Sequence, residues 1–310
     1  MPIHLLPMTR REFLARAAGA GAALLLPAWA RGAERKADPN RFALLSDTHV
    51  PTDPKLVSRG VNMVDSARQV VAEIAELDVR PAGTIVCGDL AYSAGLETDY
   101  RQLAPILKRL TDAKLPLHLI LGNHDHRENF YSVLAEQKPA KALVAGRHVS
   151  VVESPRANWF LLDSLEKTKL TPGLLGPEQL AWLAKALDEH KDKPAIVMAH
   201  HDPQVAATTA AAKVAAKISG LRDSKALFDI LVARRHVKAY VYGHRHRWWH
   251  GRHEGLHLID LPTTAYVFGK GQPSGWAIAD LKDGGIALEL RCLDRKHEAH
   301  GQKLDLAWRA

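Results

Sequence analysis

The hydrophobic pattern of the chain repeats one arrangement five times: a short apolar run stops at a cluster of His, Asp or Asn residues. Apolar runs of this length predict buried β-strands. They cover residues 42–46, 84–87, 117–121, 195–199 and 237–242. Because open α/β sheets place their sites beyond the carboxyl ends of their strands, the five clusters should meet at one edge of the fold.

Helical patterns separate the first three runs. Apolar residues recur at the spacing of one helix face over residues 61–77 and again over residues 103–110. The resulting β-α-β-α-β order predicts a parallel sheet and an α/β fold. Residues 149–153 and 159–163 predict a hairpin pair, and further helices are expected to begin at Pro177 and after a cap at Asp223.

The pattern changes to short strands after residue 246. Strands are predicted at residues 248–253, 256–261, 275–281 and 286–292, with Asp283-Gly284-Gly285 as a turn. An α/β beginning and a β-rich end fit two sheets that face each other with helices outside. We expect one domain over residues 41–292 and a C-terminal tail at 293–310, while residues 205–221 fit either a helix or a loop.

The N-terminus predicts a targeting signal. Arg10-Arg11 is followed by Phe13-Leu14, a small apolar run and the A-x-A arrangement Ala28-Trp29-Ala30. This segment resembles the signal of the bacterial twin-arginine export route, so the export machinery is an expected partner. The apolar run is too short for a stable membrane anchor. We therefore expect a cleaved signal at residues 1–30, a linker at 31–40 and a periplasmic mature protein.

Composition and charge limit the possible partners. The chain has 310 residues, 46% hydrophobic residues and a formal net charge of +8, which is typical of a globular protein with affinity for anions such as phosphates. It has no Lys/Arg block with interleaved aromatic residues, so no specific nucleic-acid partner is expected. Cys87 and Cys292 make no disulfide framework. The unusual count is His, at 17.

The five clusters have the composition of a metal site. Asp and His alternate in Asp47-Thr48-His49, and two His alternate in the last cluster, so on extended strands each pair would face one side. A carboxylate such as Asp89 can bridge two ions. The complete set of candidate ligands is Asp47, His49, Asp89, Asn123, His200, His244 and His246. Seven such ligands are too many for one tetrahedral site and suit two ions, such as Zn, Mn, Fe or Mg.

Together these motifs resemble the calcineurin-like metallophosphoesterases, over residues 41 to about 262. The resemblance rests on Asp47-Thr48-His49, Gly88-Asp89, Gly122-Asn123-His124-Asp125, His200 and Gly243-His244-Arg245-His246. Within that superfamily the chain looks like the bacterial class III cyclic-nucleotide phosphodiesterases. Residues 123–127 and 174–183, the pair His200-His201 and the pair Leu221-Arg222 support this closer match.

The resemblance implies a four-layer αββα sandwich and a small phosphoester substrate, with two bound ions of Mn, Fe, Zn or a mixture. It assigns Asp47, His49, Asp89 and His246 to the first ion, and Asp89, Asn123, His200 and His244 to the second. A hydroxide shared by both ions would attack phosphorus, most simply in a diester. His124 would stabilise or protonate the leaving oxygen, and Asp125 would orient His124.

Three features keep alternatives open. Gly88-Asp89-Leu90-Ala91-Tyr92 is similar to a motif of the purple acid phosphatases, which would make Tyr92 a ligand of ferric iron and favour monoesters. Because His49 is also present, we take it as the ligand and Tyr92 as its neighbour. His201 could replace His200. A non-catalytic scaffold is the remaining alternative, and it would usually lack ligands that this chain has.

Overall fold

The first six-stranded sheet is built around strand β1. In the computed structural model, which describes residues 36–204 and 219–310, β1 (Ala37–Ser46) lies between two unlike halves of this sheet. On one side, β4 (Arg80–Cys87) and β5 (Leu117–Ile120) run parallel to it. On the other side, β12 (Gly275–Lys282), β13 (Gly285–Cys292) and β14 (Lys303–Ala307) are antiparallel. The predicted β-α-β-α-β unit is therefore confirmed.

The second sheet also has six strands, in the order β10-β11-β9-β8-β7-β6. Its parallel part is formed by β7 (Asn158–Leu161), β8 (Ala195–Met198), β9 (Val237–Tyr242) and β11 (Leu256–Asp260). Antiparallel edge strands, β6 (Ser150–Val152) and β10 (Trp249–His253), close the two sides. The hairpin predicted before residue 163 corresponds to β6 and β7.

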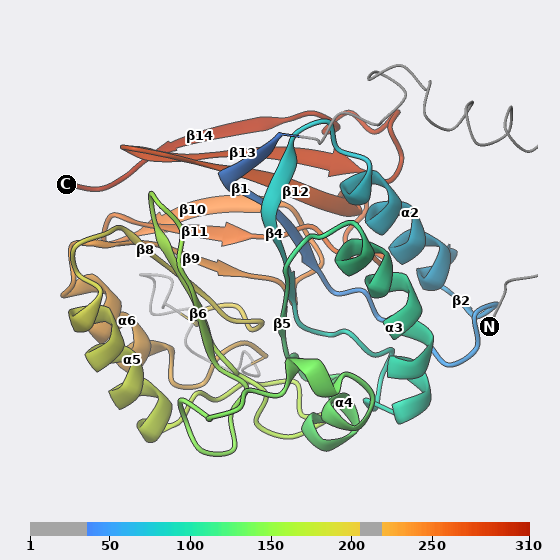
Figure 1. Ribbon diagram of the computed structural model, residues 1–310, viewed down its shortest axis with the longest axis horizontal. Coiled ribbons are helices and arrows are strands. Elements are labelled where there is room, and N and C mark those ends of the chain that lie inside the picture. The colour runs from blue at the N-terminus through green and yellow to red at the C-terminus, as the bar shows by residue number, and fades with distance from the viewer. Residues whose placement is uncertain (1–35, 205–218) are drawn as a thin grey trace, which may run out of the picture. The chain divides into compact units, whose positions relative to one another are not determined.

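Alternating side chains join the two sheets to each other and to the helices. Along β1, Phe42 and Leu44 point into a core shared with the second sheet, whereas Ala43 and Leu45 face the helical layer. Helices α2 (Met63–Ala75) and α3 (Glu97–Asp112) cover the first sheet, and α5 (Pro177–Glu189) and α6 (Ser224–Val232) cover the second (Figure 1). This arrangement is the expected four-layer α/β sandwich.

Short elements complete the fold. Strands β2 (Val57–Ser58) and β3 (Val61–Asn62) form a hairpin before α2, while α4 (Arg127–Val133) and the 3-10 turn η1 (Ala135–Gln137) follow β5. Asp223 lies at the N-terminus of α6, but its carboxylate accepts hydrogen bonds from Leu175 and Gly176 instead of capping its own helix. This residue therefore fixes the start of α5 against α6.

The domain boundaries expected from the sequence need correction at both ends. Residues 293–310 are not a tail, because β14 pairs with β13 and Leu306 is buried between the sheets. The Arg309 guanidinium then donates to the carbonyls of Leu231 and Arg234 near the end of α6. At the other end the sheet begins at Ala37, inside the expected linker. Lys303-Leu304-Asp305-Leu306 alternates in the way that a strand requires, and this pattern was a usable signal.

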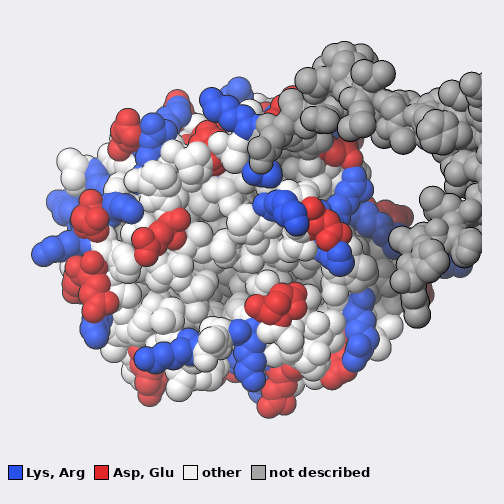
Figure 2. All heavy atoms as spheres, viewed as in Figure 1, with Lys and Arg blue, Asp and Glu red and all other residues white. Residues whose placement is uncertain are grey.

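Two further expectations concern the distribution of charge on the surface and the targeting signal at the N-terminus. Figure 2 shows basic and acidic side chains interspersed over the face that it draws, with no block of one sign. No helix in the described ranges is both long and apolar enough to cross a bilayer. The twin-arginine segment and most of residues 205–221 lie outside the described residues.

Candidate metal centre

The candidate ligands sit on sharp turns directly after the strands. Five of the nine described non-glycine residues with positive φ belong to this set: Asp47, His49, Asp89, His244 and His246, with φ between 45° and 69°. The expectation that paired ligands share one side of an extended strand is therefore wrong in its geometry. A left-handed backbone conformation costs free energy at residues other than Gly. It persists only where the surrounding structure requires it, which is typical of functional sites.

The first group of ligands joins the turn after β1 to the turn after β9. Asp47, His49 and His246 are buried and offer atoms that lie within 4.8 Å of one another. The Nε2 atoms of the two His rings are 3.1 Å apart, and His246 Nε2 is 3.3 Å from Asp47 Oδ1. These nitrogen and oxygen atoms carry lone pairs, so a single cation between them could be coordinated by all three.

Asp89 lies between this group and a second one. Its Oδ2 is 3.6 Å from His49 Nε2 and 3.3 Å from His200 Nε2. Among the described residues, His200 Nε2 and Asn123 Oδ1 are buried atoms without a hydrogen-bond partner. Buried polar atoms normally have partners, so these two atoms fit a role as metal ligands. The residues present thus suit two ions that share the Asp89 carboxylate.

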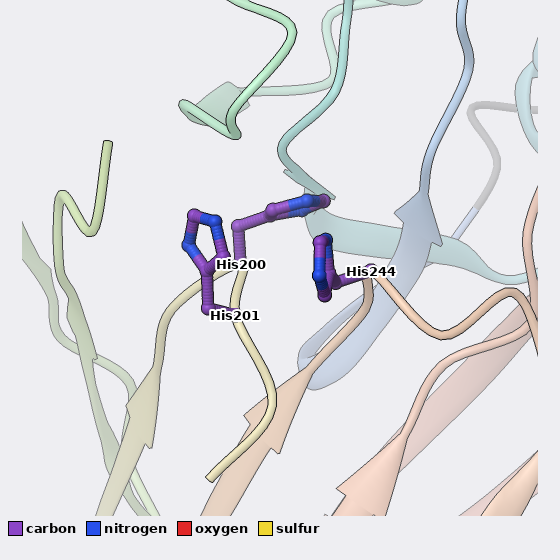
Figure 3. A group of neighbouring side chains, drawn as sticks. All are labelled: His200, His201 and His244. Atoms are coloured by element: carbon purple, nitrogen blue, oxygen red, sulfur yellow. The ribbon is translucent and has the colours of Figure 1, made fainter. Parts of the chain in front are cut away.

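The second group of candidate ligands includes histidines at the ends of β8 and β9. Figure 3 shows the His200 and His201 side chains pointing in different directions from the end of β8, and His244 approaching from the turn after β9. Either His of the pair could contribute to this group, because His200, His201 and His244 all lie close together. However, His201 Nδ1 is hydrogen-bonded to Ser164 Oγ at 2.8 Å, whereas His200 faces Asp89. We therefore retain His200 as the candidate ligand.

Backbone carbonyls hold three of these rings in place. The Nδ1 atoms of His49, His200 and His246 face the carbonyls of Tyr92, Cys87 and Tyr266 at 3.1, 2.8 and 2.5 Å. A hydrogen on Nδ1 leaves the Nε2 lone pair for a metal ion, and such partners fix the tautomer and orientation of ligand histidines. Tyr92 thus contributes its carbonyl to the site, in agreement with its predicted place beside His49.

The electrostatics of the group favour cation binding. Burial lowers the pKa of His49 to about 4 and that of His244 to about 3, so both rings are neutral at pH 7. Burial opposes the ionisation of Asp89, but its histidine neighbours, His200 above all, hold its pKa well below the usual range. Neutral His49 and His244 beside ionised carboxylates are in the protonation states that metal binding requires. Burial acts to lower the pKa of His200, but the Asp89 carboxylate outweighs it and raises that pKa to about 10, so an ion at this ring would replace its proton.

Two glycines make room for this packing. A Cβ at Gly122 would collide with the Asp89 carboxylate and with the His200 ring. Gly88 has a φ of +74°, and a Cβ there would stand 2.6 Å from His200 Nδ1. The Gly that precedes each of these ligand clusters therefore allows the polar side chains to approach each other.

His124 reaches the same site but is more accessible. Its side chain is 31% exposed, and its Nε2 lies 3.9 Å from Asp89 Oδ2. Its Nδ1 faces the Ser93 carbonyl at 2.8 Å, so Nε2 is directed to the site. This position suits a group that exchanges a proton with a bound molecule.

Asp125 has a different environment from the one expected. It was predicted to orient His124, but the Ser93 carbonyl occupies that position. The Asp125 carboxylate instead accepts hydrogen bonds from the backbone N–H groups of Leu90, Ala91 and Gly122 and from the Tyr100 hydroxyl. Burial and the nearby Asp89 charge raise its pKa to about 6. Asp125 therefore ties the Asp89 turn to the turn that carries Asn123.

An open pocket of about 430 Å³ lies over the ligands and includes groups that sequence patterns did not reveal. The Tyr266 ring stacks on His49, with 5.5 Å between centroids, and Phe268 stacks on His246 at 4.2 Å. Both lie in the apolar stretch 265–268, which ends in no cluster of His, Asp or Asn, so the pattern that marked the other site residues did not indicate them. Thr171, Ser219, Arg245 and Arg247 line other parts of the pocket.

Known proteins are similar to this chain over most of its length. A cyclic adenosine monophosphate phosphodiesterase of Pseudomonas aeruginosa is 27% identical over 231 residues, which cover 73% of this chain and 77% of the relative. A protein of Arcobacter nitrofigilis named as a probable glycerophosphodiester phosphodiesterase is 29% identical over 208 residues, which cover 66% of this chain and 70% of the relative. Both alignments span most of the described fold.

Solved structures and the family description lead to the same assignment. A dimetal phosphatase from Danio rerio superposes with a TM-score of 0.66 at 17% identity, covering 88% of this chain and all of that one, which shows the shared fold. The calcineurin-like phosphoesterase family matches residues 40–248, a range that includes every candidate ligand. The chain therefore belongs to the calcineurin-like phosphoesterase family and is a metallophosphoesterase, a hydrolase of phosphoester bonds.

Proposed function

We propose that the protein hydrolyses phosphodiesters with two metal ions bound at the strand ends. The observation that carries this proposal is the position of Asp89, whose Oδ2 lies 3.6 Å from His49 Nε2 and 3.3 Å from His200 Nε2. One carboxylate within reach of two ligand groups suits a pair of ions better than a single one. The preference for diesters is supported by the two relatives, whose names describe phosphodiesterases.

The seven candidate ligands would divide between the two ions, and Asp89 would contribute to both sites. The first ion would be held by Asp47, His49, Asp89 and His246, and the second by Asp89, Asn123, His200 and His244. When bound, such ions neutralise charge on the phosphoryl oxygens and make hydroxide available near neutral pH. The donor set of carboxylate, amide and imidazole groups suits Mn, Fe, Zn or a mixture of them.

Residues that are not ligands complete the proposed reaction. His124 Nε2 faces the pocket from the side of the Asp89 carboxylate, where it can donate a proton to the leaving ester oxygen. The exposed Arg245 guanidinium lines the pocket and has Ser219 Oγ at 3.3 Å, so it can balance charge on a phosphate. Arg247 also lines the pocket, but its charge is already paired with the buried Asp260 at 2.6 Å.

Rates on matched esters test the proposal. The purified protein, with its metal content measured by mass spectrometry, should hydrolyse bis(p-nitrophenyl) phosphate faster than p-nitrophenyl phosphate. His124→Ala should retain its metal and lose activity by about 10² to 10⁴, because a general acid contributes about this much. The loss should shrink for esters with more acidic leaving groups, which need no proton.

A matched variant serves as the control. His297→Ala removes an imidazole from the C-terminal loop and should leave both rates unchanged. Equal losses for His124→Ala across all leaving groups would remove the acid role. Two bound ions without turnover of any ester would support the non-catalytic scaffold instead.

We also propose that the protein is exported by the twin-arginine route and acts in the periplasm. The support is the sequence alone: Arg10-Arg11, an apolar run and Ala28-Trp29-Ala30 occur in the order that such signals require. Replacing both arginines by lysine should leave the protein in the cytoplasm. Exported protein whose N-terminal sequence begins at Met1 would show that the segment is retained and not cleaved after Ala30.

A further inference from the structure

The pocket over the metal centre has two unlike walls. One wall is polar and includes Thr171, Ser219 and Arg245. Another part of the lining consists of the aromatic rings of Tyr266 and Phe268, which lie against the candidate ligands His49 and His246. A phosphoester whose phosphate sits on the ligands would therefore place one ester group near an aromatic surface.

The aromatic wall is fixed to the metal centre by its backbone. Thr264 N donates to the Ser46 carbonyl at 2.8 Å, and Ala265 N donates to the Asp47 carbonyl at 3.1 Å. The Tyr266 carbonyl faces His246 Nδ1. Because the segment is bound to the same turns that carry the ligands, the position of its rings relative to a bound phosphate is predetermined.

Phe268 is the part of this wall that remains available. Its side chain is among the exposed large hydrophobic ones, at 56% relative exposure, although one contact of the ring is the parallel imidazole of His246 at 4.2 Å. An exposed phenyl ring at the mouth of a pocket gains favourable contact when another flat ring covers it. Tyr266, which is partly buried against His49, supports it from within.

Arg59 approaches the same two rings from the β2–β3 hairpin. Its guanidinium carbon lies 5.5 Å from the Tyr266 centroid and 5.4 Å from the Phe268 centroid. Arg59 and Gly60 both have positive φ, at 49° and 81°, as a two-residue I′ hairpin turn requires. Arginine is unusual at such a position, so this strained turn presents a cation to the rings where Asn or Gly would form the turn more easily.

We propose that Phe268, held by Tyr266 and Arg59, forms a specificity subsite for a planar aromatic group of the phosphoester substrate. This inference rests on the proposed function for the position of the phosphate. It predicts that esters with an aryl or heteroaryl ring bind better than esters with an aliphatic group of the same size. The ring stacks on the exposed part of Phe268, and the phosphate stays at the ligand cluster.

Binding of two phosphonates to the metal-loaded full-length protein tests the subsite without any turnover. Phenylphosphonate and cyclohexylphosphonate carry the same anionic group and a six-membered ring, but only the former is flat. The dissociation constant of phenylphosphonate, measured by calorimetry, should be lower by about 2- to 12-fold, the range expected for a stacked aromatic pair. Methylphosphonate serves as the baseline for the anionic group alone.

Variants assign the preference to one ring. Phe268→Leu keeps an apolar side chain and should bring the ratio of the two dissociation constants close to one, while Phe268→Tyr should retain it. Methylphosphonate should bind all forms alike. Trp249→Leu removes an exposed aromatic ring that stacks on Arg247 and does not line the pocket, so it should leave the ratio unchanged.

The outcomes separate this inference from the proposed reaction. Equal affinity of the unmodified protein for both cyclic phosphonates overturns the subsite whatever the variants do. A preference that survives in Phe268→Leu also overturns the assignment, since another group would then recognise the ring. A protein that prefers phenylphosphonate but hydrolyses no diester would retain the subsite and reject only the catalytic proposal.

Discussion

Replacing Asp125 by Asn separates a structural role from a catalytic one. The carboxylate accepts three backbone N–H groups at 2.8–3.1 Å and the Tyr100 hydroxyl at 3.0 Å. Asparagine keeps one acceptor oxygen and turns an NH₂ group to the remaining donors. At least one or two charge-assisted hydrogen bonds are lost, each contributing about 1.5–3 kcal/mol.

Part of this loss is offset because the substitution also removes a buried charge, whose cost is visible in a pKa raised to about 6. We expect a net decrease of about 2–4 kcal/mol in the free energy of unfolding. For a domain of this size, that corresponds to a melting temperature lower by about 5–15 °C. Metal affinity should fall as well, since the hydrogen bonds to the Asp125 carboxylate hold the turn that carries Asp89 against the turn that carries Asn123.

Thermal unfolding followed by circular dichroism measures this effect, with and without chelator so that metal binding is counted separately. Asp283→Asn is the matched control, because its side chain is 89% exposed and its replacement should change stability by less than about 0.5 kcal/mol. An unchanged melting temperature for Asp125→Asn would refute the structural role. If Asp125→Asn were as stable as the unmodified protein and showed the leaving-group dependence of His124→Ala, Asp125 would instead act by orienting His124, as the sequence predicted.

Three further substitutions test the metal centre. Asp89→Ala should lose both ions and all activity, and a protein that still carried two ions per chain would refute the shared carboxylate. Gly122→Ala should lose metal affinity without changing any ligand, because its methyl group would displace the Asp89 carboxylate or the His200 ring; titration with Mn measures this, and normal affinity would contradict the packing argument. Tyr92→Phe should change activity little and the protein should be colourless; loss of colour and metal would instead identify a tyrosinate bound to ferric iron.

The sequence predicted the strands and the identity of the clustered residues because both are local. An apolar run and the polar residues that end it are visible within ten positions, and the parallel order of the strands brings their ends together. The left-handed turns at Asp47, Asp89 and His246 were not predicted, since residues other than Gly adopt them only under the constraint of the finished packing. Local spacing therefore identified residues that the fold brings together, but it predicted the wrong backbone conformation for them.

Contacts between distant segments account for the other differences. Apart from the nearby Gly122, the donors to Asp125 come from the turn after β4 and from Tyr100 on α3, and no spacing rule links them to it. Phe268 reaches the pocket because the backbone after Thr263 is bonded to the turn after β1, more than 200 residues earlier. Hydrogen bonds of this kind depend on the complete fold, so a sequence pattern cannot show them.

The central position of β1 has a consequence for synthesis on the ribosome. One edge of β1 pairs with β4 soon after both emerge, but the other edge pairs with β12, as in Phe42 with Ala279. At roughly 5–20 residues per second, this second partner follows about 10–50 seconds later. During that interval the nascent chain carries an open strand edge and the apolar Phe42 and Leu44 face. Yield during expression should therefore depend on chaperones that cover this edge until translation of the last strands is complete.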